Sequence, residues 1–144
     1  MTRSVNKAYK VVFDPRGPIE GMKCCLKGHF IMSSLILCYS LIDAMAWLGL
    51  PGNQNEVHKQ DFIRWARQYV LSIGSLDCTA EDLYAARCGV LHTMTPESAL
   101  SRKGQAKQIV YAWGTGKPYS SSNLQKLGLS IIMIHVDTLC DAVE

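Results

Sequence analysis

The sequence lacks the features that mark several common classes of protein. Its six cysteines include no pair at two-residue spacing and no regular ladder, so neither paired zinc knuckles nor a disulfide scaffold is predicted. Runs of one charge sign are also missing. Fifteen basic and 12 acidic residues are scattered over 144 positions and leave a net charge of +3. This mild excess permits binding to nucleic acid through a local cluster but does not require it.

A signal peptide is not predicted either, because the first twenty residues are polar and contain two prolines. We therefore expect a cytoplasmic protein with reduced thiols. One apolar run, Phe30 to Leu50, is long enough to span a bilayer. Three serines and Asp43 interrupt it, and an unpaired acid at mid-bilayer costs about 2.5–3.5 kcal/mol on insertion scales. We expect a buried core helix here, and no membrane partner.

The composition favours one folded domain over residues 1–144, since hydrophobic residues make up 48% and charged residues 19%. The prolines and glycines of residues 1–22 predict an irregular arm without a stable helix. A long helix is expected over 23–48, closed by Gly49 and Pro51. An amphipathic helix over 59–71 follows, then one over 80–93 in which Thr79 and Asp82 form a capping box.

The pattern changes after the helical core of residues 23–105. Pro96 is expected to start one more short helix. Residues 108–113 and 130–136 are rich in Ile, Val and Tyr and flank a loop with glycines and a serine run, so they predict a small β-hairpin. Asp137 is expected to cap a final helix. The fold class is thus mainly α, with a strand pair and a last helix in 106–144.

The helix over 80–93 carries the residues best suited to chemistry. Arg87 is followed at the fifth position by His92, near the end of an amphipathic helix that comes third in the expected bundle. This pattern resembles the HEPN superfamily, whose motif is an arginine, four to six residues, and a histidine. The resemblance covers residues 23 to about 105. In that family a polar residue follows the arginine, whereas this sequence has Cys88.

The resemblance implies a helical bundle that forms a homodimer and cleaves RNA without a metal or other cofactor, as a toxin or defence component with an antitoxin partner. Histidine suits proton transfer near neutral pH, and arginine matches phosphate oxygens in two-point contact. His92 would then be the acid or base and Arg87 the phosphate clamp. Asp43 is expected to hold the Arg87 guanidinium, and Tyr84, one turn earlier, to stack on a base or orient a phosphate.

Other interpretations stay open. A non-catalytic HEPN-like module that binds RNA, a nucleotide or a protein would keep the same scaffold, and a buried Asp43–Arg87 pair could serve helix packing alone. Cys88 and His92 lie one helical turn apart, but nothing completes a thiolate–imidazole or metal site around them. The strongest basic cluster for RNA binding is expected to consist of Arg102, Lys103 and Lys107, with a solvated helix face as its alternative.

Overall fold

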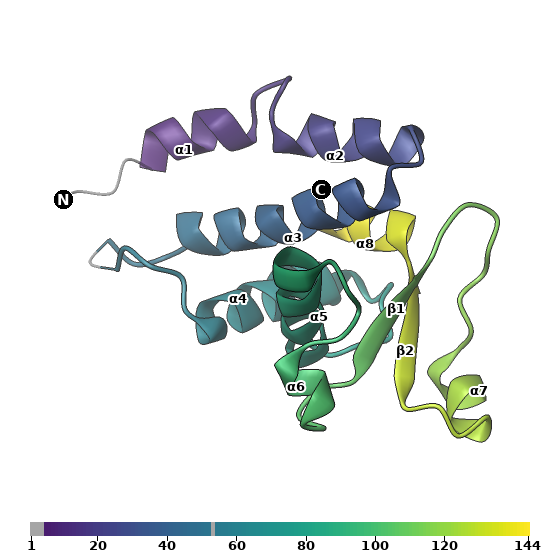
Figure 1. Cartoon of the computed structure of the whole chain (residues 1–144). Coiled ribbons are helices and arrows are strands. Elements are labelled where there is room, and N and C mark those ends of the chain that lie inside the picture. Colours follow the sequence, from purple (N-terminus) through teal and green to yellow (C-terminus); the bar gives the residue numbers. More distant parts are fainter. Residues whose placement is uncertain (1–4, 53) are drawn as a thin grey trace.

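The computed structural model describes residues 5–52 and 54–144. One hydrophobic core runs through these residues, and its axis is α3 (Ile31–Leu48). Figure 1 shows α1 (Val5–Val12) and α2 (Pro18–Lys27) along one side of α3, with α4 (Lys59–Trp65) and α5 (Ala80–Thr93) on the other. The last helix, α8 (Val136–Val143), packs directly against α3 as well. The prediction of a mainly α fold is confirmed.

The expected irregular arm over residues 1–22 is wrong for the part that the structure describes; residues 1–4 lie outside it. Pro15, Gly17 and Pro18 mark a turn between two helices rather than a stretch without helix, because Pro18 is the first residue of α2. The turn is tight: a Cβ on Gly17 would lie 2.5 Å from the Val11 carbonyl oxygen. Met22 on α2 is buried against α3, which explains why this segment orders.

The single helix expected over 23–48 is also wrong, because the chain reverses at residues 28–30. Gly28 closes α2 by donating to the Cys24 carbonyl, and His29 adopts a left-handed φ of 61° before α3 begins at Ile31. The reversal places α2 beside α3. Each helix then buries apolar side chains against the other, whereas one straight helix would leave these side chains exposed to solvent. Ser34 of α3 fastens the pair by donating to the Met22 carbonyl at 3.3 Å.

The second predicted helix changes winding along its length. After α4 the chain continues through a π-helical turn, Ala66–Val70, and a 3-10 turn, Leu71–Ile73, and ends at Gly74 with φ 71°. Both Ala66 and Val70 are buried.

Helix α5 begins at the Thr79–Asp82 capping box, so this prediction is confirmed. The short α6 (Ala99–Arg102) starts after Ser98 rather than at Pro96, so the predicted start of this helix is wrong.

The strand pair is present but is not a hairpin. Strands β1 (Gln108–Ala112) and β2 (Ile131–His135) run parallel, with Gln108 opposite Ile131 and Ala112 opposite His135. A parallel pair needs a crossover connection, and α7 (Ser121–Lys126) lies within it. The expected hairpin is therefore wrong in direction. The predicted cap of α8 is wrong by two residues: His135 is the N-cap, and its Nδ1 accepts the Asp137 backbone N–H at 3.3 Å.

Among the described helices, α3 alone has the length and composition of a membrane-spanning helix. In the structure α3 contacts α1, α2, α4, α5 and α8. These contacts are the ones expected of a central core helix.

Helix α4 offers a pH-dependent stability test, because Asp61 caps it. The Asp61 carboxylate accepts the His58 backbone N–H at 2.9 Å, Gln54 Nε2 at 2.7 Å and Arg64 Nη2 at 2.7 Å. The hydrogen bond from the His58 backbone, followed by those from Gln54 and Arg64, lowers the Asp61 pKa below its ordinary value of 3.8 despite partial burial.

We expect Asp61→Asn to lower the free energy of unfolding at pH 7 by about 1–2 kcal/mol, because one carboxylate oxygen and its charge are lost. A pKa that is lower in the folded state stabilises the protein above pH 3.8, and this contribution disappears as pH falls through the folded pKa. Urea unfolding of both proteins between pH 7 and pH 2 should therefore show two stability curves that converge as the pH falls below 3.8 and through the lower, folded pKa of Asp61. A constant offset over the whole range would contradict the ionised cap.

Candidate functional site

The candidate site lies where the end of α5 crosses α3. Arg87 of α5 reaches Asp43 of α3 and donates two hydrogen bonds to the same carboxylate oxygen, from Nε at 2.9 Å and from Nη2 at 2.8 Å. Its remaining terminal nitrogen, Nη1, lies 3.3 Å from His92 Nε2. The three side chains therefore form a continuous chain, Asp43–Arg87–His92, within one protomer.

The length of the arginine side chain brings Arg87 and His92 together. Residues five apart on a helix lie about 140° apart around its axis, so either the helix end must loosen or a long side chain must reach across this gap. The helix does not loosen, since α5 stays α-helical to Thr93 and ends with Met94 in a left-handed conformation at φ 53°. The two hydrogen bonds to Asp43 hold one edge of the Arg87 guanidinium, and this orientation places Nη1 next to the His92 imidazole.

The Arg87–His92 contact assigns a role to one imidazole nitrogen. An arginine can only donate, so His92 Nε2 is the acceptor in this contact. The same nitrogen could take part in proton transfer once Arg87 Nη1 turned to another oxygen. Asp43 and His92 use three of the five guanidinium N–H groups, and the Cys88 side chain also interacts with the guanidinium, so at most two N–H groups remain for another oxygen-bearing ligand.

Two of the three side chains are partly buried, and the third is exposed. The Asp43 and Arg87 side chains are 26% and 23% exposed, whereas His92 is exposed to solvent. Burial by itself lowers the Arg87 pKa, but hydrogen bonding to Asp43 and its charge outweigh this effect, and the net pKa is raised. Arg87 thus stays cationic at neutral pH, with Asp43 behind it and a solvent-facing histidine in front.

Tyr84 lies one turn before Arg87 on the same side of α5. Its ring packs edge-on against Phe62 of α4, with centroids 5.4 Å apart, and Lys59 Nζ lies 5.6 Å from the ring centroid. Burial, followed by the neighbouring Cys88, raises the Tyr84 pKa, so the phenol stays protonated and can donate. Sequence patterns did not indicate Lys59 or Phe62, because their proximity to Tyr84 depends on how α4 packs against α5.

Gly89 positions the segment that follows His92, although sequence reasoning did not identify it as a functional residue. A Cβ at this position would lie 2.5 Å from the Thr95 carbonyl oxygen and 2.7 Å from that of Glu97. The Gly89 carbonyl also accepts the Thr93 hydroxyl at 2.9 Å. The chain beyond His92 therefore folds back onto α5 at a distance that only glycine allows.

The predicted basic cluster does not converge on one point. Arg102 lies 3.8 Å from Glu97, and Lys107 donates its backbone N–H to Asp82 at 2.7 Å; both line a cavity that Lys103 does not reach. Within the described residues, no three His, Cys, Asp or Glu side chains are grouped to hold a metal ion.

Comparisons with protein-family models, with curated proteins and with solved structures found no match to this chain.

Proposed function

We propose that this protein is a metal-independent endoribonuclease of HEPN type. The observation that carries the proposal is the 3.3 Å contact between Arg87 Nη1 and His92 Nε2, with the arginine held from behind by Asp43. A fixed cation beside an exposed imidazole is what cleavage of an RNA phosphodiester by its own 2′-hydroxyl requires.

The proposed reaction uses each group in a defined step. When a phosphate binds, Arg87 Nη1 exchanges His92 Nε2 for a phosphate oxygen. The freed Nε2 lone pair then removes the proton from the ribose 2′-hydroxyl, whose oxygen attacks the adjacent phosphorus. The bond between phosphorus and the 2′-oxygen forms while the bond to the 5′-oxygen breaks. Two N–H groups of Arg87 bind the phosphate oxygens as negative charge develops on them. The 5′-oxygen leaves with a proton, which a second histidine in a two-fold dimer would donate, or else water.

Neighbouring groups suit a single-stranded RNA substrate. The Tyr84 ring and the Lys59 ammonium lie on the side of Arg87 that faces α4. An aromatic face accepts any base by stacking, and a lysine contacts a neighbouring phosphate. Unpaired RNA presents both at once, whereas the bases of a duplex are already stacked. A homodimer, a cytoplasmic location and an antitoxin partner belong to the same proposal.

The test is cleavage of a fluorescently labelled, single-stranded RNA by the purified protein in the presence of EDTA. We expect cleavage that survives chelation and yields 2′,3′-cyclic phosphate and 5′-hydroxyl ends, since both follow from attack by the 2′-hydroxyl. A substrate with 2′-deoxyribose throughout should remain intact. Cleavage that needs a divalent cation, or that acts equally on the deoxy substrate, would contradict the proposed chemistry.

One observation favours a second candidate, a non-catalytic module that binds RNA. Arg87 already uses three of its N–H groups inside the protein, and Cys88 replaces the polar residue that accompanies this motif in the family it resembles. In that case the parent protein and the Arg87→Ala variant should differ in RNA affinity while neither shows cleavage. Filter binding on the same labelled RNA separates the two candidates.

A further inference from the structure

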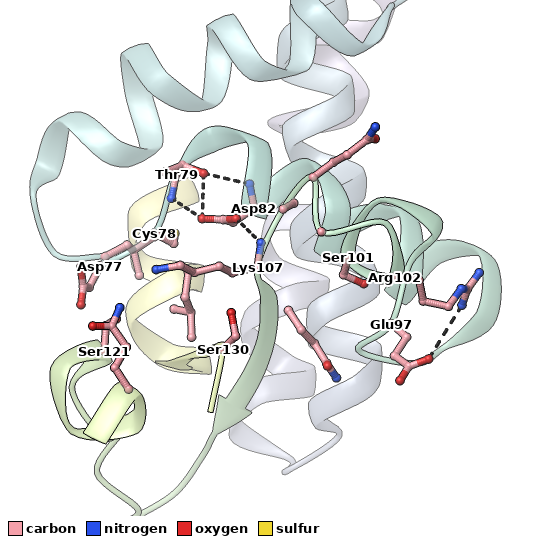
Figure 2. Close-up of a pocket in the computed structure, with 17 residues that line it drawn as sticks. Asp77, Cys78, Thr79, Asp82, Glu97, Ser101, Arg102, Lys107, Ser121 and Ser130 are labelled. Atoms are coloured by element: carbon pink, nitrogen blue, oxygen red, sulfur yellow. Dashed lines mark hydrogen bonds and ion pairs between the residues drawn. The ribbon is translucent and has the colours of Figure 1, made fainter. Parts of the chain in front are cut away.

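A cavity of about 900 Å³ lies apart from the Arg87–His92 site. It opens between the amino end of α5, the segment that leads through α6 to β1, and the first residues of β2 and α7 (Figure 2). Asp82, which lines it, is separated from Arg87 by about 140° around the α5 axis. Its volume is within the range of about 300–1,000 Å³ that is typical of small-molecule sites.

Most of the charge around this cavity is already neutralised. Asp82 is buried, and its two oxygens accept the backbone N–H groups of Thr79 and Lys107 and the Thr79 hydroxyl. Glu97 faces Arg102 at 3.8 Å, and Figure 2 places this pair at the end of the cavity opposite Asp77. Among the described residues no partner is found for the Asp77 carboxylate or the Lys107 ammonium. The cavity thus offers one free carboxylate and one free ammonium.

The uncharged lining is rich in side chains that can both donate and accept. Three glutamine amides and two serine hydroxyls face the cavity, and these side chains have no hydrogen-bond partner in the described part of the chain: Gln105, Gln108, Gln125, Ser121 and Ser130. Leu76 and Ile132 add an apolar surface. Amides next to an apolar wall suit a flat heterocycle that has donors and acceptors on its edge.

Cysteine chemistry is not expected in this cavity. Burial, followed by the charges of Asp82 and Asp77, raises the pKa of the Cys78 thiol to about 12. The thiol therefore stays protonated at neutral pH and acts as part of the wall, since the thiolate is the reactive form.

We propose that this cavity binds a nucleoside monophosphate. The base would lie against Leu76 and Ile132 and use the glutamine amides, the ribose hydroxyls would donate to Asp77, and the phosphate would bind the Lys107 ammonium. Each part of the nucleotide matches a lining side chain for which no protein partner is found among the described residues. The site is separate from the proposed RNA-cleaving residues and does not depend on them.

The experiment is isothermal titration calorimetry of the full chain with each of the four nucleoside 5′-monophosphates. Separate titrations use inorganic phosphate, the free nucleosides, and a trinucleotide that distinguishes a strand end from a free nucleotide. We expect binding of at least one monophosphate, weaker binding of its nucleoside, and little binding of phosphate alone. Loss of one hydrogen bond to a charged group costs about tenfold or more in affinity, so Lys107→Met should weaken binding by at least that factor.

Lys103→Met is the matched control, because Lys103 is an exposed lysine of the same segment that does not line the cavity. It should bind as the parent does. Gln108→Leu should weaken binding of the nucleoside as well as the nucleotide, since it acts on the base. Equal affinity in the Lys107→Met and Lys103→Met variants would overturn the proposal, as would phosphate that binds as tightly as any nucleotide. Absence of binding to every monophosphate at millimolar concentration would do the same, whatever the RNA-cleavage assay shows.

Discussion

His92→Ala is expected to reduce RNA cleavage by a factor of about 10²–10⁴, the usual contribution of a positioned general acid or base. The His92 side chain is exposed and hydrogen-bonded to Arg87, so its removal leaves the core intact. The free energy of unfolding should change by less than about 0.5 kcal/mol, as for ordinary surface substitutions. Single-turnover cleavage rates and urea unfolding of the same preparations provide both measurements.

The control for this variant is His29→Asn, which changes another exposed histidine. His29 has φ 61°, a conformation that asparagine tolerates, so the fold should be kept. Its cleavage rate should equal that of the parent. If the His29→Asn and His92→Ala proteins cleave RNA at the same rate, proton transfer by His92 is not part of the reaction.

Arg87 needs a different design, because its loss leaves Asp43 without its ion-pair partner. Arg87→Lys keeps the charge but loses the fork that binds Asp43 and a phosphate at once, and it should cleave far more slowly than the parent. Asp43→Asn keeps an oxygen acceptor and should retain part of the activity. A purely structural Asp43–Arg87 pair predicts instead that both variants lose stability while cleavage per folded molecule stays constant.

Gly89→Ala is the second substitution with a large expected effect, and its sign is opposite to what helix propensity suggests. Alanine in an exposed helix interior is worth about 1 kcal/mol over glycine. Here the added Cβ would lie 2.5 Å from the Thr95 carbonyl oxygen and 2.7 Å from that of Glu97, and both are backbone atoms of a segment folded against the helix. Overpacking of this kind costs about 1–3 kcal/mol, so we expect net destabilisation in urea unfolding.

The matched control is Gly52→Ala, since no atom lies within 4 Å of its added Cβ. It should unfold within about 0.5 kcal/mol of the parent. Gly89→Ala should also slow RNA cleavage more than its loss of stability explains, because the displaced segment begins directly after His92 and Thr93. A Gly89→Ala protein that is more stable than the parent would contradict the close approach of residues 95–97 to the helix.

The parts of the fold that the sequence predicted are those set by local signals. The Thr79–Asp82 capping box specifies the start of α5 through bonds within four residues, and Gly74 ends the preceding turn with a positive φ. The parts that it missed depend on distant contacts. Gly28 is the one local signal for the reversal at His29, and a glycine within a helical pattern is not decisive, because a helix can also continue through it. The packing of α2 on α3 decides between the two outcomes.

In the candidate site, too, local sequence patterns predicted some residues, and the packing of helices determined the others. The motif selected Arg87 and His92, and the expectation that Asp43 meets Arg87 followed from packing the first long helix on the third. Lys59 could not be predicted, because its place over the Tyr84 ring depends on how α4 crosses α5. Whether the two strands run parallel or antiparallel could not be predicted either. Residues 113–130 are long enough for the loop of a hairpin or for the crossover of a parallel pair, and the structure shows a crossover that contains α7.

The packing of α8 on α3 has a consequence for synthesis on the ribosome. Cys38 of α3 faces the Leu139 carbonyl, 101 residues further along the chain, and Lys23 pairs with Glu144. While residues 49–135 are being translated, the apolar side of α3 that α8 later covers has no native partner. At elongation rates of about 5–20 residues per second this lasts several seconds, during which a nascent chain would depend on chaperones to avoid aggregation.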